Sequence, residues 1–156
     1  MSLNAVSPAQ GGAQAPSEHL TIAGYASLFG IADLAGDVVR AGAFRASLRR
    51  VRRVPMLVRH DPRLVAGRWI EVKEDTRGLY VRGEIDPARP GAALARRLIA
   101  RGLDGLSIGF VTRAARKRAK GRELLELDLV EVSLVDRPMM PQARLTRTAG
   151  FQPAGV

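Results

Sequence analysis

The sequence predicts a mostly β fold with inserted helices (α+β), an antiparallel β-barrel of about six or seven strands flanked by short helices. Apolar and polar residues alternate with a period of two in many short segments, which is typical of half-buried strands. Turn-forming residues separate these segments, and helical spacing is confined to two stretches. Strands this short and numerous favour a closed or nearly closed barrel over a doubly wound parallel sheet.

The 156 residues fit one domain, and a hydrophobic content of 46% is enough for a core of ordinary size. Residues 1–18 are rich in Ala, Gly, Pro, Ser and Gln, so we expect a flexible N-terminal arm before a protein domain over residues 19–145. Residues 146–156 have a similar composition, and we expect a flexible C-terminal tail there.

In the first half of the domain, alternation predicts strands over residues 19–29, 54–60, 67–74 and 78–85. A loop rich in Gly and Asp, residues 30–37, follows the first strand. Helical spacing of apolar residues predicts a short helix over residues 43–51. The strand over residues 54–60 should end at "HDP", because Pro62 cannot continue a strand ladder.

In the second half, Leu94, Leu98 and Ile99 form an apolar stripe that predicts a helix over residues 90–101. Two long strands should follow, over residues 106–118 and 123–136, joined by a basic turn. The whole pattern therefore places most of the chain in strands.

Composition narrows the chemistry that the chain can perform. Cysteine is absent, which excludes thiol nucleophiles, disulfides and thiolate metal sites. His19 and His60 are the two histidines, so we expect neither a multi-histidine metal site nor a cofactor. No segment approaches the ~20 apolar residues of a membrane helix. No basic segment precedes an apolar run at the N-terminus, as it would in an export signal. We therefore expect a cytoplasmic protein without a membrane partner.

The net charge of +10, from 25 Lys and Arg against 15 Asp and Glu, favours a polyanionic partner, either nucleic acid or an acidic protein. Arginine usage in a GC-rich genome is the alternative explanation. A basic cluster, which a solvated hairpin would also explain, contributes to this charge; it comprises Arg113, Arg116, Lys117, Arg118, Lys120 and Arg122. Base stacking is not expected, because aromatic residues make up 4% of the chain and none is interleaved with the cluster.

Three polar residues interrupt apolar strand sequence. Ser107 alternates with Leu106 and Ile108, and Gly109 leaves the serine's face of the strand partly bare. His60 ends the strand over residues 54–60, on the same face as Met56 and Val58. Glu131 lies between two valines and should share a face with Leu129 and Ser133. Burying a carboxylate or an imidazole costs several kcal/mol unless it finds partners, so these residues could be partners of one another.

Such a trio suits nucleophilic catalysis. A serine needs a neutral histidine within hydrogen-bond reach as its base, and the histidine needs an acceptor on its other nitrogen. Ser107, His60 and Glu131 could fill these roles, but the pattern alone favours simpler explanations: packing for Ser107, turn capping for His60 and pairing with an arginine for Glu131. Asp128 and Asp61 compete with Glu131 as the acceptor. The residues alone therefore indicate a serine hydrolase on a β scaffold without settling it.

The order of several motifs resembles a known family. "GYASLFGIADLAGDVVRAGAFRASL", "VPMLVRHDPRLVAGRW", "GLYVRGEI", "LDGLSIGF" and "LVEVSLVDRPMMPQAR" occur as in the prohead proteases of tailed bacteriophages, the capsid-maturation serine peptidases also encoded by prophages and gene transfer agents. The similarity runs from about Ile22 to Arg144. It implies an assemblin-like barrel, with the histidine of "RHD" as general base and the serine of "GLSIGF" as nucleophile. The glutamate of "VEVSLV" best matches the third position.

The resemblance implies a capsid-maturation serine endopeptidase that acts inside the assembling procapsid, in the cytoplasm of a bacterial host. Its partners would be the major capsid protein, whose N-terminal scaffolding segment it removes, and itself as a second substrate. A homo-oligomer and nonspecific contact of the basic surface with DNA are further expectations left open. Backbone amides, or Arg137, would stabilise the oxyanion. A non-catalytic assembly factor with the same fold and a basic nucleic-acid-binding barrel are the alternatives.

Overall fold

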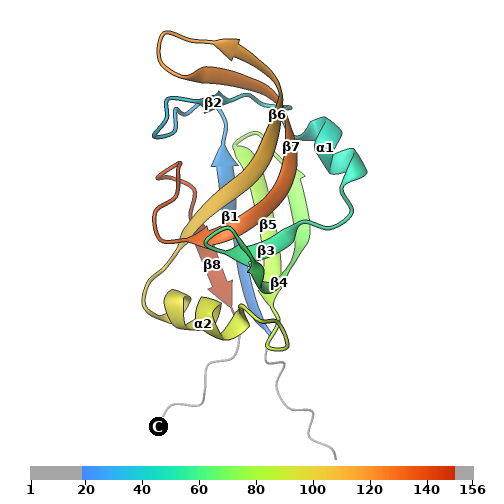
Figure 1. The fold of residues 1–156 in the computed structure, drawn as a ribbon, viewed down its shortest axis with the longest axis vertical. Coiled ribbons are helices and arrows are strands. Elements are labelled where there is room, and N and C mark those ends of the chain that lie inside the picture. The colour runs from blue at the N-terminus through green and yellow to red at the C-terminus, as the bar shows by residue number, and fades with distance from the viewer. Residues whose placement is uncertain (1–18, 150–156) are drawn as a thin grey trace, which may run out of the picture.

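The computed structural model describes residues 19–149, which form eight strands and two helices (Figure 1). The predicted arm over residues 1–18 lies outside the described residues. The elements in chain order are β1 (Leu20–Leu28), β2 (Val38–Val39), α1 (Arg45–Arg50), β3 (Pro55–Val58), β4 (Asp61–Glu74), β5 (Gly78–Ile85), α2 (Ala92–Ala100), β6 (Gly105–Lys117), β7 (Arg122–Val135) and β8 (Leu145–Ala149).

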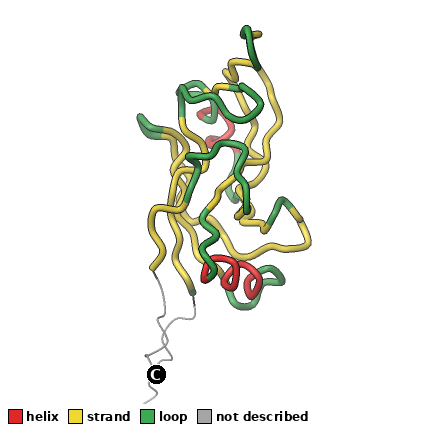
Figure 2. Tube along the Cα trace, turned by 90° about the vertical axis from the view of Figure 1, so that its left-hand side faces the viewer, coloured by secondary structure: helices red, strands yellow, loops and turns green. Residues whose placement is uncertain are grey.

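All eight strands belong to one sheet, in the order β2-β7-β3-β4-β5-β1-β8, and β6 pairs with β7 outside this path. The sheet is strongly curved in the view of Figure 2, but its strand pairing does not close into a ring. One isolated bridge, between Gly105 at the start of β6 and Arg144 just before β8, lies at the gap. The predicted mostly β fold with few helices is confirmed.

The sheet is mixed where the sequence predicts an antiparallel one. β7 pairs parallel with β2 and with β3, whereas its pairing with β6 is antiparallel. Parallel neighbours need a long connection, and here β4, β5, α2 and β6 all lie between β3 and β7 in the chain. Alternation within a strand carries no information about such a distant partner. The parallel pairs are therefore beyond the reach of the sequence pattern.

The turn at Pro62 differs from its prediction. β3 ends at Val58 and β4 begins at Asp61, so that Pro62 lies inside β4 and His60 lies in a two-residue turn rather than at a strand end. The proline is tolerated because β5 pairs with β4 only from Gly67 onward, which leaves the first residues of β4 at a sheet edge.

The C-terminal tail begins later than predicted. Residues 145–149 form β8, which pairs antiparallel with β1, and residues 150–156 lie outside the described residues. A sheet edge supplies hydrogen-bonding partners to a polar segment, so composition alone placed the boundary too early.

Both predicted helices are confirmed and cover the core. α1 packs against β7, and α2 packs against β4 at the lower end of the molecule in Figure 1. The α1 residue Ser47 is buried and its Oγ accepts a hydrogen bond from the Leu129 N–H at 2.9 Å. The core is one cluster of apolar side chains, whose largest fully buried members include Phe44, Ile22, Met56, Leu79, Ile85, Leu106, Leu124, Leu127 and Leu134. Its burial is the main force that holds β6 and β7 in position.

Candidate active site

Ser107 lies on β6 in register with polar residues of β7. It is directly opposite Ser133, and Gly109 is directly opposite Glu131. Because paired residues of antiparallel strands point to the same face, the four residues share one face of the sheet. The sequence pattern predicts that Ser107 and Gly109 share a face of β6 and that Glu131 and Ser133 share a face of β7. The register between the two strands shows that these are the same face of the sheet.

A β-bulge in β7 places Glu131 and Leu129 on opposite faces of the strand. The register shifts between Gly109 and Phe110, so that Phe110 pairs with Leu129 and Val130 is passed over. Leu129 consequently packs in the core cluster, and Val130 is exposed. The prediction that Glu131 shares its face with Leu129 is wrong for this reason, whereas the sharing with Ser133 is confirmed.

Gly109 provides the space in which the Glu131 side chain lies. A Cβ atom added at Gly109 would lie 2.9 Å from Glu131 Cδ and would overlap Glu131 Oε1. Any larger residue would therefore displace the carboxylate. The glycine that follows Ser107 by two places thus has a steric role at the site.

His60 is carried by a tight turn with strained backbone. Arg59 and His60 connect β3 to β4 and have φ values of 52° and 60°, the left-handed region that favours glycine. The turn is held to β7 by the Arg59 N–H, which donates to the Leu134 carbonyl at 2.9 Å. The Arg59 guanidinium also donates to the Asp136 carboxylate at 2.6 Å. These contacts offset a backbone strain of about 1–3 kcal/mol for each residue.

The imidazole of His60 meets the carboxylate of Glu131. His60 Nδ1 is in hydrogen-bond contact with Glu131 Oε1. The Glu131 side chain is 10% exposed and the His60 side chain 45% exposed, so the carboxylate is buried beneath a ring that is open to solvent. With a carboxylate as its neighbour, Nδ1 carries the proton and Nε2 is left as the basic nitrogen.

Ser133 connects the turn to the carboxylate. Its Oγ donates to Glu131 Oε2 at 2.6 Å and accepts a hydrogen bond from the His60 N–H at 3.2 Å. Ser133 is completely buried. Sequence analysis gave this residue no role, because a serine in a strand carries no sign of what its hydroxyl binds; its position two residues after Glu131 is the one available signal.

The competing acceptors are engaged elsewhere. Asp128 binds Arg113 and Arg50, and the hydrogen bond from Arg113 is the main reason why the pKa of Asp128 lies below its usual value. Asp61 binds its neighbour Arg63, whose hydrogen bonds lower the pKa of Asp61. Among the hydrogen bonds of the described residues, the Glu131 carboxylate binds His60 and Ser133 and no arginine.

Ser107 and His60 both line a pocket of about 260 Å³. Their side chains share its wall without a direct hydrogen bond in the described part of the chain, an arrangement common in serine hydrolases without substrate. The pocket walls are mainly apolar and include Val39, Leu106, Ile108, Phe110, Leu124 and Met140. The arrangement places a serine hydroxyl and an imidazole held by Glu131 beside one cavity. Arg137, the alternative oxyanion donor, is exposed just beyond β7.

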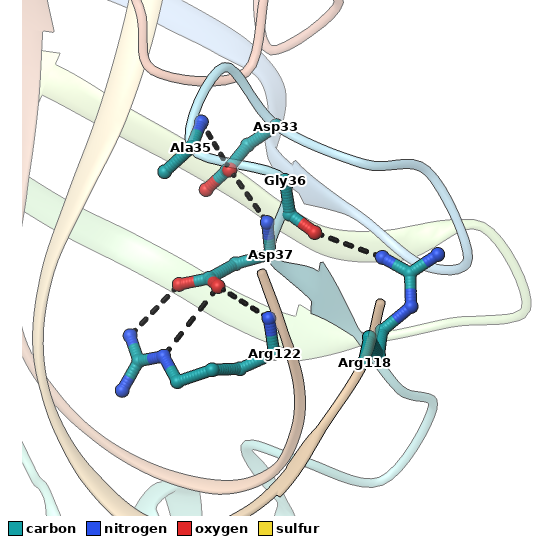
Figure 3. Close-up of polar contacts among 6 residues, drawn as sticks. All are labelled: Asp33, Ala35, Gly36, Asp37, Arg118 and Arg122. Carbon is teal, nitrogen blue, oxygen red and sulfur yellow. Dashed lines mark hydrogen bonds and ion pairs between the residues drawn. The ribbon is translucent and has the colours of Figure 1, made fainter. Parts of the chain in front are cut away.

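The loop between β1 and β2 forms another wall of this pocket, through Asp33, Ala35 and Asp37. Figure 3 shows Asp33 Oδ1 accepting the N–H groups of Ala35 and Asp37, at 2.8 and 2.9 Å. The Asp37 carboxylate binds Arg122, whose hydrogen bond is the main cause of its lowered pKa. Sequence analysis treated this segment as a turn and missed its place at the site.

The basic cluster is largely occupied with contacts inside the protein. Arg113 pairs with Asp128, and Arg116 pairs with Glu123. Arg122 pairs with Asp37, and Arg118 donates to the Gly36 carbonyl at 2.8 Å (Figure 3). The cluster therefore braces the β6–β7 hairpin and the pocket loop.

No helix within residues 19–149 has the length and apolar character needed to cross a bilayer.

A model of a known protein family matches most of the chain. The family model described as caudovirus prohead serine protease matches residues 9–153. The prohead protease of Enterobacteria phage HK97 is 40% identical over 90 residues, which cover 56% of this chain and 40% of that protein. The chain thus spans less than half the length of this curated relative.

Two solved structures with a similar fold are viral proteases. The capsid assembly protease of bacteriophage T4 matches with a TM-score of 0.61 at 14% identity, over 74% of this chain and 80% of that one. KSHV protease, in complex with a hexapeptide phosphonate inhibitor, matches with a TM-score of 0.58 at 15% identity, over 85% of this chain and 66% of that one. At this identity the similarity establishes an assemblin-like fold.

Proposed function

Because the chain belongs to the caudovirus prohead serine protease family, we propose that it is a serine endopeptidase with Ser107 as nucleophile, His60 as general base and Glu131 as the group that orients His60. The observation that carries this proposal is the contact of His60 Nδ1 with Glu131 Oε1, beside the pocket that Ser107 also lines. A carboxylate buried under a solvent-facing imidazole has the geometry that a catalytic histidine needs.

In the proposed reaction, Ser107 Oγ attacks the carbonyl carbon of a peptide bond while its proton passes to His60 Nε2. Glu131 accepts the hydrogen bond from Nδ1–H and stabilises the imidazolium. The imidazolium then protonates the leaving amine as the C–N bond breaks, which leaves an acyl ester on Ser107. Water attacks this ester and gives a proton to Nε2; the bond between Ser107 Oγ and the acyl carbon then breaks, Nε2 returns the proton to Oγ, and the carboxyl product leaves. Backbone N–H groups of β6 or the Arg137 guanidinium would bind the oxyanion.

We propose that the substrate is the N-terminal scaffolding segment of the major capsid protein, cleaved inside the assembling procapsid in the bacterial host cytoplasm. The names of the relatives, a prohead protease and a capsid assembly protease, support this setting. The net charge of +10 favours association with an acidic scaffold. Cleavage of the chain itself would follow from its confinement with the same substrate.

The intact mass of the purified protein tests the nucleophile. The wild type, Ser107→Ala and His60→Ala are each incubated with and without a fluorophosphonate, which modifies activated serines. We expect one adduct on the wild type, located at Ser107, and none on either variant. The Ser107→Ala change removes a single oxygen and should leave the thermal unfolding midpoint unchanged.

Co-expression with the major capsid protein tests the substrate. We expect the wild type to shorten the capsid protein at its N-terminus and Ser107→Ala to leave it intact.

In the fluorophosphonate experiment, an adduct at another residue would contradict the assignment of Ser107. Capsid processing that survives Ser107→Ala would instead favour the non-catalytic assembly factor.

A further inference from the structure

We propose that the pocket beside Ser107 binds a lysine side chain of the substrate, at the residue whose carbonyl Ser107 attacks. This inference rests on the proposed function and adds its substrate preference. The pocket joins mainly apolar walls to two polar groups: Ser27 Oγ, which has no hydrogen-bond partner among the described residues, and the Asp33 carboxylate. A long aliphatic stem with a terminal ammonium matches both parts.

The walls suit the aliphatic stem of a lysine. Leu106, Ile108 and Phe110 of β6 line the pocket together with Val39 and Leu124. A volume of about 260 Å³ is large enough for a full side chain rather than a methyl group. Burial of the methylene groups against these residues would contribute to binding. A short or strongly polar side chain would leave the apolar walls of the pocket exposed to water.

Ser27 provides an independent sign that a ligand completes the pocket. The residue is 2% exposed, lines the pocket, and its Oγ has no hydrogen-bond partner among the described residues. A buried hydroxyl without a partner destabilises a fold, and such groups are rare unless something else binds them. A terminal ammonium, which has three donors, would satisfy this oxygen.

The charge of the pocket favours a cation. Asp33 and Asp37 are its carboxylates, and no lysine or arginine occurs among the described residues that line it. Asp37 is neutralised by Arg122, whose Nη2 lies 2.8 Å from its Oδ2. Asp33 uses Oδ1 for two backbone N–H groups (Figure 3) and feels the charge of Arg122 at longer range, but none of the ion pairs within residues 19–149 involves it. Asp33 is thus the group available to an ammonium, and a glutamate side chain would be repelled.

The wall that carries Asp33 is held rigidly, as a specificity site requires. Arg118 and Arg122 bind Gly36 and Asp37 from the β6–β7 hairpin (Figure 3). Gly121 packs against Gly36 so closely that a Cβ atom at Gly121 would overlap the Gly36 backbone. The carboxylate of Asp33 therefore has a fixed position relative to Ser107.

Three diphenyl phosphonates test the inference; they differ only in the side chain next to phosphorus, which is that of lysine, norleucine or glutamate. Ser107 Oγ displaces one phenoxide, so that an O–P bond forms, a P–O bond breaks, and phenol leaves with the proton that His60 has taken. The rate of adduct formation is read from intact mass. We expect lysine to react about 10- to 100-fold faster than norleucine, and glutamate slowest.

Two variants identify the residues responsible. Asp33→Asn keeps the oxygen that accepts the Ala35 and Asp37 N–H groups and removes the charge, so the lysine-to-norleucine rate ratio should fall toward one. Ser27→Ala should also lower this ratio, while its thermal unfolding midpoint stays level or rises because an unpaired buried hydroxyl is removed. Asp86→Asn is the matched control, because Asp86 accepts the Ala88 N–H in a similar turn away from the pocket, and its ratio should match the wild type.

The outcomes separate this inference from the proposed function. If a plain fluorophosphonate labels Ser107 but lysine and norleucine react equally fast, the lysine pocket is wrong and the protease stands. A lysine preference that persists in Asp33→Asn would also overturn the assignment. If no phosphonate labels the wild type, free or inside procapsids, the proposed function fails and this inference fails with it.

Discussion

Gly109 and Glu131 face each other across the β6–β7 ladder, and the carboxylate of Glu131 occupies the space that a side chain at Gly109 would fill. The pairing explains why a glycine follows Ser107 by two places. It also sets the distance of the carboxylate from the strand, so that Oε1 meets His60 Nδ1 and Oε2 meets Ser133 Oγ. The glycine and the glutamate are therefore one structural unit.

Replacing Gly109 with alanine should disable the site without unfolding the protein. The added methyl group displaces the Glu131 carboxylate, and a misplacement of this size lowers catalytic rates by about 100-fold. The measurement is the rate of fluorophosphonate labelling, with circular dichroism to verify the fold. Val111→Ala on the same strand, at a position 47% exposed, is the control and should label at the wild-type rate. Normal labelling of Gly109→Ala would mean that Glu131 does not act from this position.

The identity of the third catalytic residue is tested by two matched amide substitutions. Glu131→Gln keeps the size of the side chain but removes the charge that stabilises imidazolium, so labelling should slow on the order of 10³- to 10⁴-fold with some activity left. Asp128→Asn should leave the rate unchanged, because Asp128 binds Arg113 and Arg50. The reverse result would transfer the role to Asp128.

Ser133→Ala should slow labelling by about 10- to 100-fold, since a hydrogen bond to a charged group contributes about 1.5–3 kcal/mol. The hydroxyl binds both Glu131 and the His60 N–H, so its loss frees the carboxylate and the turn together. The labelling rate as a function of pH is the readout, because a change in packing alone would not alter the pH dependence.

Ser47→Ala is the control for Ser133→Ala. Ser47 is equally buried, and its Oγ accepts the Leu129 N–H, so its removal leaves a buried donor unpaired and should lower stability by about 1–3 kcal/mol. Its labelling rate should nevertheless equal that of the wild type. If both serine variants lose stability and rate in parallel, Ser133 has only a structural role.

The helices and the longer strands of the fold could be predicted because each follows from a local period. Both helices and most strands lie where alternation or helical spacing places them. The parallel pairing of β3 with β7 could not be predicted, because it depends on a partner more than 70 residues away in the chain. β8 was missed because a short polar strand at a sheet edge resembles a tail in composition.

For the site, the sequence identified residue types and faces but not their contacts. His60 and Glu131 were candidates as interruptions of apolar strands, and the structure brings their side chains together. The left-handed turn at Arg59 and His60 was beyond prediction, because neither residue favours that conformation. Ser133 and the Asp33–Asp37 loop were missed because their contacts arise from the register and from loop packing.

The ion pair between Asp37 and Arg122 should make stability depend on acid pH. Hydrogen bonds from Arg122 hold the pKa of Asp37 below its usual value of 3.8 in the folded protein. A carboxyl group with a depressed folded pKa stabilises the fold above its unfolded pKa and loses this contribution as the pH falls through the folded value. Asp37→Asn should therefore be less stable than the wild type at neutral pH, by about 1–3 kcal/mol.

Denaturant unfolding of both proteins between about pH 2 and pH 7 measures this dependence. The difference in the free energy of unfolding should be constant above the unfolded pKa and shrink below it, because protonated Asp37 resembles asparagine. Asp61→Asn is the control: Asp61 pairs with Arg63 at the surface, where the Arg63 side chain is 87% exposed, so its difference should be small throughout. A difference between wild type and Asp37→Asn that stays constant into acid would mean that the contribution of Asp37 does not come from its ionised carboxylate.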